Sequence, residues 1–337
     1  MAYGDSDLEL AYAIGKEVKP GFMTDVRERM FIGKFGGKQT VKLHKGDTFE
    51  VNRLDSNDPV TDEMRGVENP DKSTMTYEKL TGSIKRFGSY FEYADHVVKT
   101  HDDPILDMNK SAATQQAASS IETLSANVIR GSSQVFLADG ATRGQVTAGI
   151  RTGLFKIATR YLEHSETVAI TKMQKSSPNY GEISIPSCFV ALFDPMLSEE
   201  MRTLAGFVSI ETSAMPAINE NQIGWLGRYA LVASNYMKPW EGAGGAVNTA
   251  NIAGNSVSGK AHVYPIVLFG EGAFDFNGMQ GEDGADIIVH NPTVSDTDKY
   301  GQLGHIAWLT WFGGMVKQQK YICRLEVTAK TDSALGA

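Results

Sequence analysis

The residues best suited to catalysis are scattered along this 337-residue chain and do not fall into catalytic spacings. Seven histidines are present, and the closest two in the sequence are His96 and His101. No HExxH pattern or other metal-ligand spacing occurs, and the acidic residues beside His101 are better explained as the solvated start of a helix. From this spacing we expect no bound metal ion.

The cysteines and the glycine-rich run lead to the same expectation. Cys188 and Cys323 each lie in an apolar, strand-like run without a histidine partner in a known motif, which predicts buried free thiols. Residues 242–245 (GAGG) are followed by Ala-Val-Asn-Thr and lack the lysine of a phosphate-binding loop. No GxSxG nucleophile motif occurs. We expect no catalytic residue, no cofactor and no enzymatic activity.

Composition is that of an acidic globular protein. Hydrophobic residues make up 42% of the chain and charged residues 21%, a balance that argues against disorder. The formal net charge of -8 argues against broad attraction to nucleic acid. Arg27, Arg29 and Lys34 belong to a local basic excess, which solvated surfaces usually explain. The chain shows no secretory signal and no apolar stretch long enough to span a membrane.

The elements that would position any functional residue begin with a long strand. Residues 76–91 alternate polar and apolar side chains, which predicts a strand about 50 Å long at roughly 3.3 Å per residue. Its expected partner is 39–51, and 52–73 would connect the two strands through turn-forming residues. An isolated two-stranded ribbon is marginal in water. The pattern therefore indicates surfaces completed by a neighbouring copy, as in an assembling structural protein.

Two amphipathic helices follow, at 104–130 and 145–163. The first has the apolar stripe Ala113, Ala117, Ile121, Leu124 and Val128, and the second has Val146, Ile150, Leu154, Ile157 and Tyr161. Beyond residue 183 the chain consists mostly of short strands with one helix at 198–205. The strand candidates are 188–193, 229–234, 262–269, 287–290, 306–312 and 321–328. This order of elements predicts an α+β protein.

Several stretches from about residue 76 onward occur in an order that is typical of one protein family. They are KRFGSYFEYADHV (85–97), the helix 104–130, SCFVALFDPMLSEEMRTL (187–204), NENQIGWLGRYALVASNYM (219–237), DKYGQLGHIAWLTWFGG (298–314) and YICRLEV (321–327). In these stretches the chain resembles the major capsid (coat) proteins of tailed bacteriophages, in the subfamily typified by the N4-like podophages. Gln222 stands where that family usually has Glu, and residues 1–37 match only loosely.

The resemblance implies the capsid fold that is shared with encapsulins and herpesvirus capsid floors. It divides the chain into an N-terminal arm at 1–37, an extended β-ribbon loop at 38–93 and a peripheral domain at 94–186, which carries a spine helix at 104–130. An axial domain follows at 187–318. Residues 319–337 would be a C-terminal strand that returns to the peripheral domain, and a tail.

The implied function is self-assembly into hexamers and pentamers of an icosahedral shell around the double-stranded DNA genome of a phage. The implied partners are other copies of the chain, a separate scaffolding protein, a portal, a decoration protein, and DNA through weak non-specific contacts. The protein would be part of the virion capsid after assembly in the host cytoplasm. The expected inter-subunit contacts are Tyr77, Lys79, Lys85, Arg86, Gly224, Gly227 and Gly244, and the expected genome-facing residues are Arg27, Arg29 and Lys34.

Two alternatives are left open by the sequence. An encapsulin-like compartment would have the same fold and enclose protein cargo, so the nucleic acid content of purified particles separates it from a phage coat. A soluble hydrolase with an unrecognised site around His262 and Glu271 would sediment as a small monomer and turn over a substrate.

Overall fold

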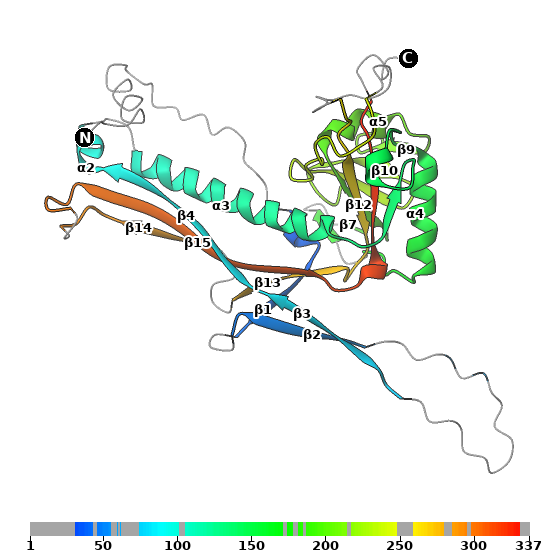
Figure 1. Ribbon diagram of the computed structural model, residues 1–337, viewed down its shortest axis with the longest axis horizontal. Helices are drawn as coiled ribbons and strands as arrows, with labels where there is room; N and C mark the ends of the chain where they lie inside the picture. The colour runs from blue at the N-terminus through cyan, green and yellow to red at the C-terminus, as the bar shows by residue number, and fades with distance from the viewer. Residues whose placement is uncertain are drawn as a thin grey trace, which may run out of the picture.

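A long helix and a narrow sheet form one half of the molecule, and a seven-stranded sheet forms the other (Figure 1). The computed structural model describes residues 31–42, 46–54, 59, 61, 74–100, 105–170, 174–177, 181–184, 187–213, 217–247, 259–279, 285–294 and 298–330. None of the helices in these ranges is long and apolar enough to cross a lipid bilayer.

Helix α3 (Ile105–Arg130) confirms the predicted long helix, whose expected first residue, 104, lies outside the described part of the chain. The predicted stripe is only partly right. Its first two members are buried, but its last three are half-buried, and the other buried residues are Glu122, Ser125, Ala126 and Ile129. The buried face shifts because α3 packs first on the narrow sheet and then on the short turn η1 (Ile32–Lys34) and its neighbours.

Strand β15 (Leu303–Val316) is the centre of the narrow sheet that α3 covers (Figure 1). It pairs antiparallel with β4 (Lys85–Ala94), β14 (Ala285–His290) and β13 (Phe274–Met279), and β1 (Gly37–Val41) joins β13 in parallel. Trp308 of β15 is buried against Ala113 and Ala117, and its Nε1 donates a 2.8 Å hydrogen bond to Oε1 of Gln116. The small side chains of α3 thus let the helix lie close to the sheet.

The predicted ribbon is present but shorter than expected. Strand β2 (Thr48–Leu54) pairs antiparallel with β3 (Tyr77–Ser83), whereas residues 85–91 belong to β4 of the narrow sheet. The prediction of one unbroken strand over 76–91 with 39–51 as its partner is therefore wrong. The chain changes sheets at Ile84, whose side chain is buried and whose N–H donates to the carbonyl of Asp47 at 2.7 Å.

All six strands predicted beyond residue 183 are present, with shifted ends. Two are β14 and β15, and four lie in the seven-stranded sheet. That sheet has the order β5 (Val135–Leu137), β16 (Ile322–Val327), β12 (Tyr264–Phe269), β8 (Phe189–Phe193), β11 (Tyr229–Ala233), β10 (Gln222–Leu226) and β9 (Phe207–Ser209). The remaining elements include α2 (Asp95–Thr100), α5 (Ser198–Arg202) and the hairpin of β6 (Gln174–Ser177) with β7 (Gly181–Ser184).

Helix α4 (Thr152–His164) starts later than the predicted residue 145. The carboxylate of Asp139 accepts the N–H groups of Thr147 and Ala148 at 2.8 and 3.0 Å, so this stretch is extended instead of helical. The buried face of α4 contains Leu154, Phe155, Ala158 and Leu162, while Ile157 from the predicted stripe is exposed.

Strands from both sides of the predicted boundary at residue 187 share one sheet. β16 lies between β5, from the segment 94–186, and β12, from the segment 187–318. β13, β14 and β15, also from 187–318, lie beside α3. The division into arm, loop, peripheral and axial domains stays a prediction.

Candidate functional site

The β2–β3 ribbon extends from the body of the molecule with both faces open (Figure 1). Tyr77, a predicted contact residue, is 60% exposed at the end of β3. Lys79 is also a predicted contact residue, and it forms a 3.4 Å ion pair across the ribbon with Glu50. Both side chains are exposed. Phe49 anchors the base of the ribbon by packing over Gly82. Arg53, near the outer end of β2, pairs with Glu78 across the ribbon and donates through Nη1 to Oε1 of Gln318 at 2.9 Å. Exposed ion pairs contribute little stability, so beyond the contacts of Arg53 the outer part of the ribbon has few stabilising contacts of its own.

The face of the narrow sheet that turns away from α3 carries exposed apolar side chains. Tyr90 of β4, Ala307 of β15 and Ile288 of β14 lie side by side in register. Tyr90 is 63% exposed, Ile288 51%, and Leu303, further along β15, 56%. We call the surface formed by these four residues the outer face. The row of Tyr90, Ala307 and Ile288 is exposed apolar surface of the kind that marks a contact with another macromolecule, and the row of Glu92, His305 and His290 separates it from Leu303.

Charged and titratable groups border the row of Tyr90, Ala307 and Ile288 on both sides. Toward the start of β4, Arg86 is exposed, and its guanidinium lies 5.7 Å from the ring centroid of Trp311. Toward Leu303, the imidazoles of His290 and His305 stack with their centroids 4.8 Å apart. The predicted contact Arg86 therefore lies beside apolar surface that the sequence analysis did not identify, whereas Lys85 is exposed one position earlier on β4, where it pairs with Phe312.

Two of the three glycines predicted at subunit contacts are inside the chain's own packing. A Cβ on Gly224 would lie 2.5 Å from the carbonyl of Val208, and one on Gly244 would lie 2.9 Å from the carbonyl of Val146. Both glycines are buried and offer no surface to a neighbouring copy, so the predicted contact at these positions is not supported. Gly227 is exposed between β10 and β11 with a φ of 60°, a conformation that favours glycine.

A buried carboxylate joins the start of the described chain to α3. Oε2 of Glu122 accepts the N–H of Ile32 at 3.3 Å. Burial raises the pKa of Glu122 to about 7, while the N–H groups at residues 31–33 and the charge of Lys34 act in the opposite direction. Lys34, a predicted genome-facing residue, is exposed at the end of η1. Arg27 and Arg29 lie outside the described residues.

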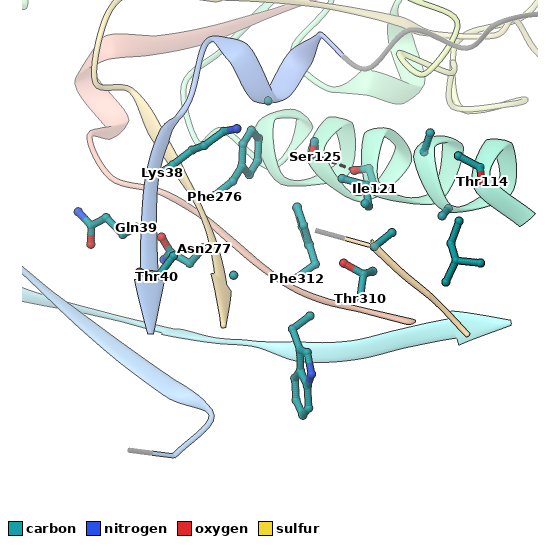
Figure 2. Close-up of a pocket in the computed structure, with 17 residues that line it drawn as sticks. Lys38, Gln39, Thr40, Thr114, Ile121, Ser125, Phe276, Asn277, Thr310 and Phe312 are labelled. Carbon is teal, nitrogen blue, oxygen red and sulfur yellow. Dashed lines mark hydrogen bonds between the residues drawn. The ribbon is translucent and has the colours of Figure 1, made fainter. Parts of the chain in front are cut away.

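A cavity of about 380 Å³ lies between α3 and the narrow sheet. Figure 2 shows Thr310 and Phe312 projecting from β15 toward α3, with β1 along another side. Asn277 of β13 also lines this cavity and is buried, yet neither polar atom of its amide has a hydrogen-bond partner. A buried amide without a hydrogen-bond partner lowers the stability of the folded chain. Replacing Asn277 therefore tests whether its amide is unpaired.

The residues proposed for an enzyme do not form a site. His262 precedes β12 and accepts the N–H of Gly242 at 3.0 Å through Nδ1, whereas Glu271 follows the strand. The six residues of β12 between them span about 20 Å. Burial raises the pKa of Cys188 to about 11 and that of Cys323 to about 12, so both thiols are unreactive. In the described part of the chain, no group of three or more potential ligands could hold a metal ion.

Comparison with known proteins finds phage capsid proteins, although no family model matches the chain. The major capsid protein of Pseudomonas phage KPP21 is 21% identical over 270 residues, which cover 74% of this chain and 68% of that protein. The capsid of Ralstonia phage GP4 superposes with a TM-score of 0.68 at 13% identity, covering 94% of this chain and 96% of the other. The capsid of cyanophage P-SCSP1u gives 0.63 at 11% identity, with coverages of 98% and 96%.

These similarities extend over nearly the whole chain and include both the long helix with its narrow sheet and the seven-stranded sheet. They confirm the predicted α+β class and the predicted capsid fold. The N4-like subfamily and the relation to encapsulins and herpesvirus capsid floors stay predictions. The chain has the fold of bacteriophage capsid proteins.

Proposed function

We propose that this chain is a major capsid protein of a tailed phage, which assembles into the hexamers and pentamers of an icosahedral shell around double-stranded DNA. The single observation that carries the proposal is that a chain with a capsid fold leaves its ribbon and its outer face uncovered. The protein is then a structural component of the virion capsid and not an enzyme, and it assembles in the host cytoplasm.

The ribbon supports the proposal because it is not stable by its own contacts. A two-stranded ribbon needs a third strand or a packed face to be ordered in water. The exposed side chain of Tyr77 and the Lys79–Glu50 ion pair would gain partners on a neighbouring copy. Contacts of this kind are weak singly and strong together, because a closed shell repeats each of them.

The outer face supports the proposed capsid function for a different reason. Tyr90, Ile288 and Leu303 are large apolar side chains on regular strands, where a monomer would place polar ones. Covering them removes apolar area from water at about 25 cal/mol per Å². We infer that this face is covered in the shell, with Arg86 at its rim.

Shell formation is tested by expressing the full chain and examining it by sedimentation and electron microscopy. We expect closed particles of megadalton mass, and a monomer of 36.7 kDa would contradict the proposal. Ile288→Asp places a charge in the outer face and should prevent closure. Ile157→Asp is the matched control, because Ile157 is similarly exposed on α4 in the other half of the molecule.

The ribbon is tested separately with Tyr77→Ala, which should reduce assembly without loss of subunit secondary structure. Tyr300→Ala is its control, since Tyr300 is exposed in the turn before β15. Full assembly by Tyr77→Ala would remove the ribbon from the proposed contacts.

Other partners follow from the proposed function. A separate scaffolding protein, a portal and a decoration protein are proposed to act with the shell, and Lys34, Arg27 and Arg29 are proposed to face the genome through weak contacts. Particles isolated from infected cells should contain double-stranded DNA. Particles filled with protein cargo and free of DNA would favour the encapsulin-like alternative.

A further inference from the structure

Three guanidinium groups meet around one indole ring where α3 ends. Arg130 is the last residue of α3, Arg143 lies in the short turn η2 (Arg143–Gln145), and Arg324 lies in β16. Their guanidinium carbons are 4.6, 3.8 and 5.2 Å from the ring centroid of Trp240. We call these four residues the arginine cluster.

The arginine cluster holds more positive charge than its internal partner neutralises. Nε and Nη2 of Arg143 donate to Glu326 at 2.8 and 2.6 Å, and Nε of Arg324 donates to the same carboxylate at 2.9 Å. Three guanidiniums and one carboxylate give a net charge of +2. Arg324 also donates to the carbonyl of Arg130 at the C-terminal end of α3, where the helix dipole offsets about half a charge. Positive charge therefore remains.

Arg130 is the member of the arginine cluster whose positive charge is not neutralised. Within the described residues it forms no ion pair with a carboxylate, its Nη1 makes a 3.3 Å bond to Oδ1 of Asn127, and its buried Nε has no partner. Burial lowers the pKa of Arg130, and repulsion from Arg324 and Arg143 lowers it further. A partly buried charge that is repelled by its neighbours is costly unless an anion binds it.

We propose that the arginine cluster is a binding site for a phosphate group. The internal hydrogen bonds leave Nη1 of Arg143 and Nη2 of both Arg130 and Arg324 available, and stacking on Trp240 holds the guanidinium planes in place. Each of these free nitrogens can donate a charge-assisted hydrogen bond to an oxygen of one phosphate. The side chain of Arg143 is 34% exposed, so the site opens to solvent.

Phosphate as the ligand fits the charge of the site. A free phosphate ion carries about -1.5 to -2 charge at neutral pH, which matches the excess of the cluster. Each phosphate of a nucleic acid backbone carries a single negative charge and offers the same acceptor oxygens. The free ion needs no assumption about the shell, whereas a nucleic acid source rests on the proposed function.

The first test measures the binding of inorganic phosphate to the full-length chain by calorimetry and by thermal unfolding, with sodium chloride at equal ionic strength as the reference. Phosphate should raise the unfolding midpoint more than chloride does. Arg130→Gln should weaken phosphate binding about tenfold or more, because a charge-assisted contact is lost. Arg130→Lys should also bind more weakly, because an ammonium does not stack on the indole ring as a planar guanidinium does. Arg202→Gln, at an exposed arginine of α5 paired with Glu199 at 3.5 Å, should bind like wild type.

Arg130→Gln should behave differently if the arginine cluster only stabilises the fold. If Arg130 serves stability alone, Arg130→Gln unfolds more easily without phosphate, and its response to phosphate equals that of wild type. If the site binds phosphate, Arg130→Gln is at least as stable as wild type in phosphate-free buffer and loses the phosphate response. An equal response of both proteins, or a response no larger than that to chloride, overturns the proposal.

A duplex oligonucleotide distinguishes the two sources. If the DNA backbone is the ligand, Arg130→Gln should reduce the salt dependence of duplex binding by about one unit of slope. If the free ion is the ligand, the variant loses inorganic phosphate binding and keeps the duplex slope. Neither outcome depends on shell formation, which electron microscopy reports independently.

Discussion

Replacing Glu122 with glutamine should remove a pH dependence of stability that this residue imposes on the chain. Glu122 is buried on α3 and accepts the N–H of Ile32 at 3.3 Å. Burial, the largest influence, raises its pKa from the ordinary value of 4.5 to about 7. The unfolded chain has the ordinary pKa, so the two states bind different numbers of protons between these two pH values.

The direction in which stability changes with pH follows from whether the folded or the unfolded chain holds the proton on Glu122. Between about pH 4.5 and 7 the folded chain keeps a proton that the unfolded chain has released, so the free energy of unfolding falls as the pH rises. The shift corresponds to about 3 kcal/mol, at about 1.4 kcal/mol per pH unit. This contribution is present below pH 4.5 and lost above pH 7. Glu122→Gln is neutral throughout and should not show the loss.

The measurement is urea unfolding of the unassembled chain at pH 5 and at pH 8 for both proteins. Asp194 and Glu200 are also buried acids with raised pKa values, and both proteins share them, so the difference between the two proteins isolates Glu122. The wild type should lose about 2–3 kcal/mol more than the variant over this range. Parallel pH profiles would show that the carboxyl group is not held in a buried, neutral form, and would refute the reasoning.

Four further substitutions test buried polar groups, packing and ion pairs by urea unfolding. Asn277→Val should stabilise the chain by about 1–2 kcal/mol by removing an unsatisfied amide, and a loss of stability would mean that the amide has a partner. Gly88→Ala should cost about 1–3 kcal/mol, because its Cβ would lie 2.6 Å from the carbonyl of Trp308; an unchanged midpoint would contradict this close approach. Glu326→Gln should cost about 3–5 kcal/mol by leaving the buried guanidinium of Arg324 without its carboxylate, whereas Glu163→Gln, in an exposed ion pair, should change stability by less than about 1 kcal/mol. Equal losses from the last two would refute the distinction between buried and exposed pairs.

The Glu122 contact also bears on the proposed assembly. It attaches the turn η1 to α3, so the acidity of the medium would act on the contact between η1 and α3. The ribbon and the outer face lie on the other elements of the same half, so the surfaces proposed to meet neighbouring copies are concentrated around α3 and the narrow sheet.

Most of the helices and strands could be predicted from local sequence patterns. The apolar stripe of 104–130 predicted α3, and short apolar runs predicted six strands that are all present. These patterns are local, because a helix or strand repeats its buried positions every few residues. Burial of Cys188 and Cys323 could likewise be predicted from their apolar surroundings. The order of such stretches was enough to indicate the capsid fold.

How these elements pair and which side chains come into contact could not be predicted from local patterns. The break at Ile84, the pairing of β1 with β13 and the shift in the buried face of α3 all depend on partners distant in the sequence. The same holds for the arginine cluster, whose Arg130 and Arg324 are 194 residues apart. Strand pairing and charge clustering arise from contacts between segments that are distant in the sequence. Local periodicity does not predict which of these segments will be in contact.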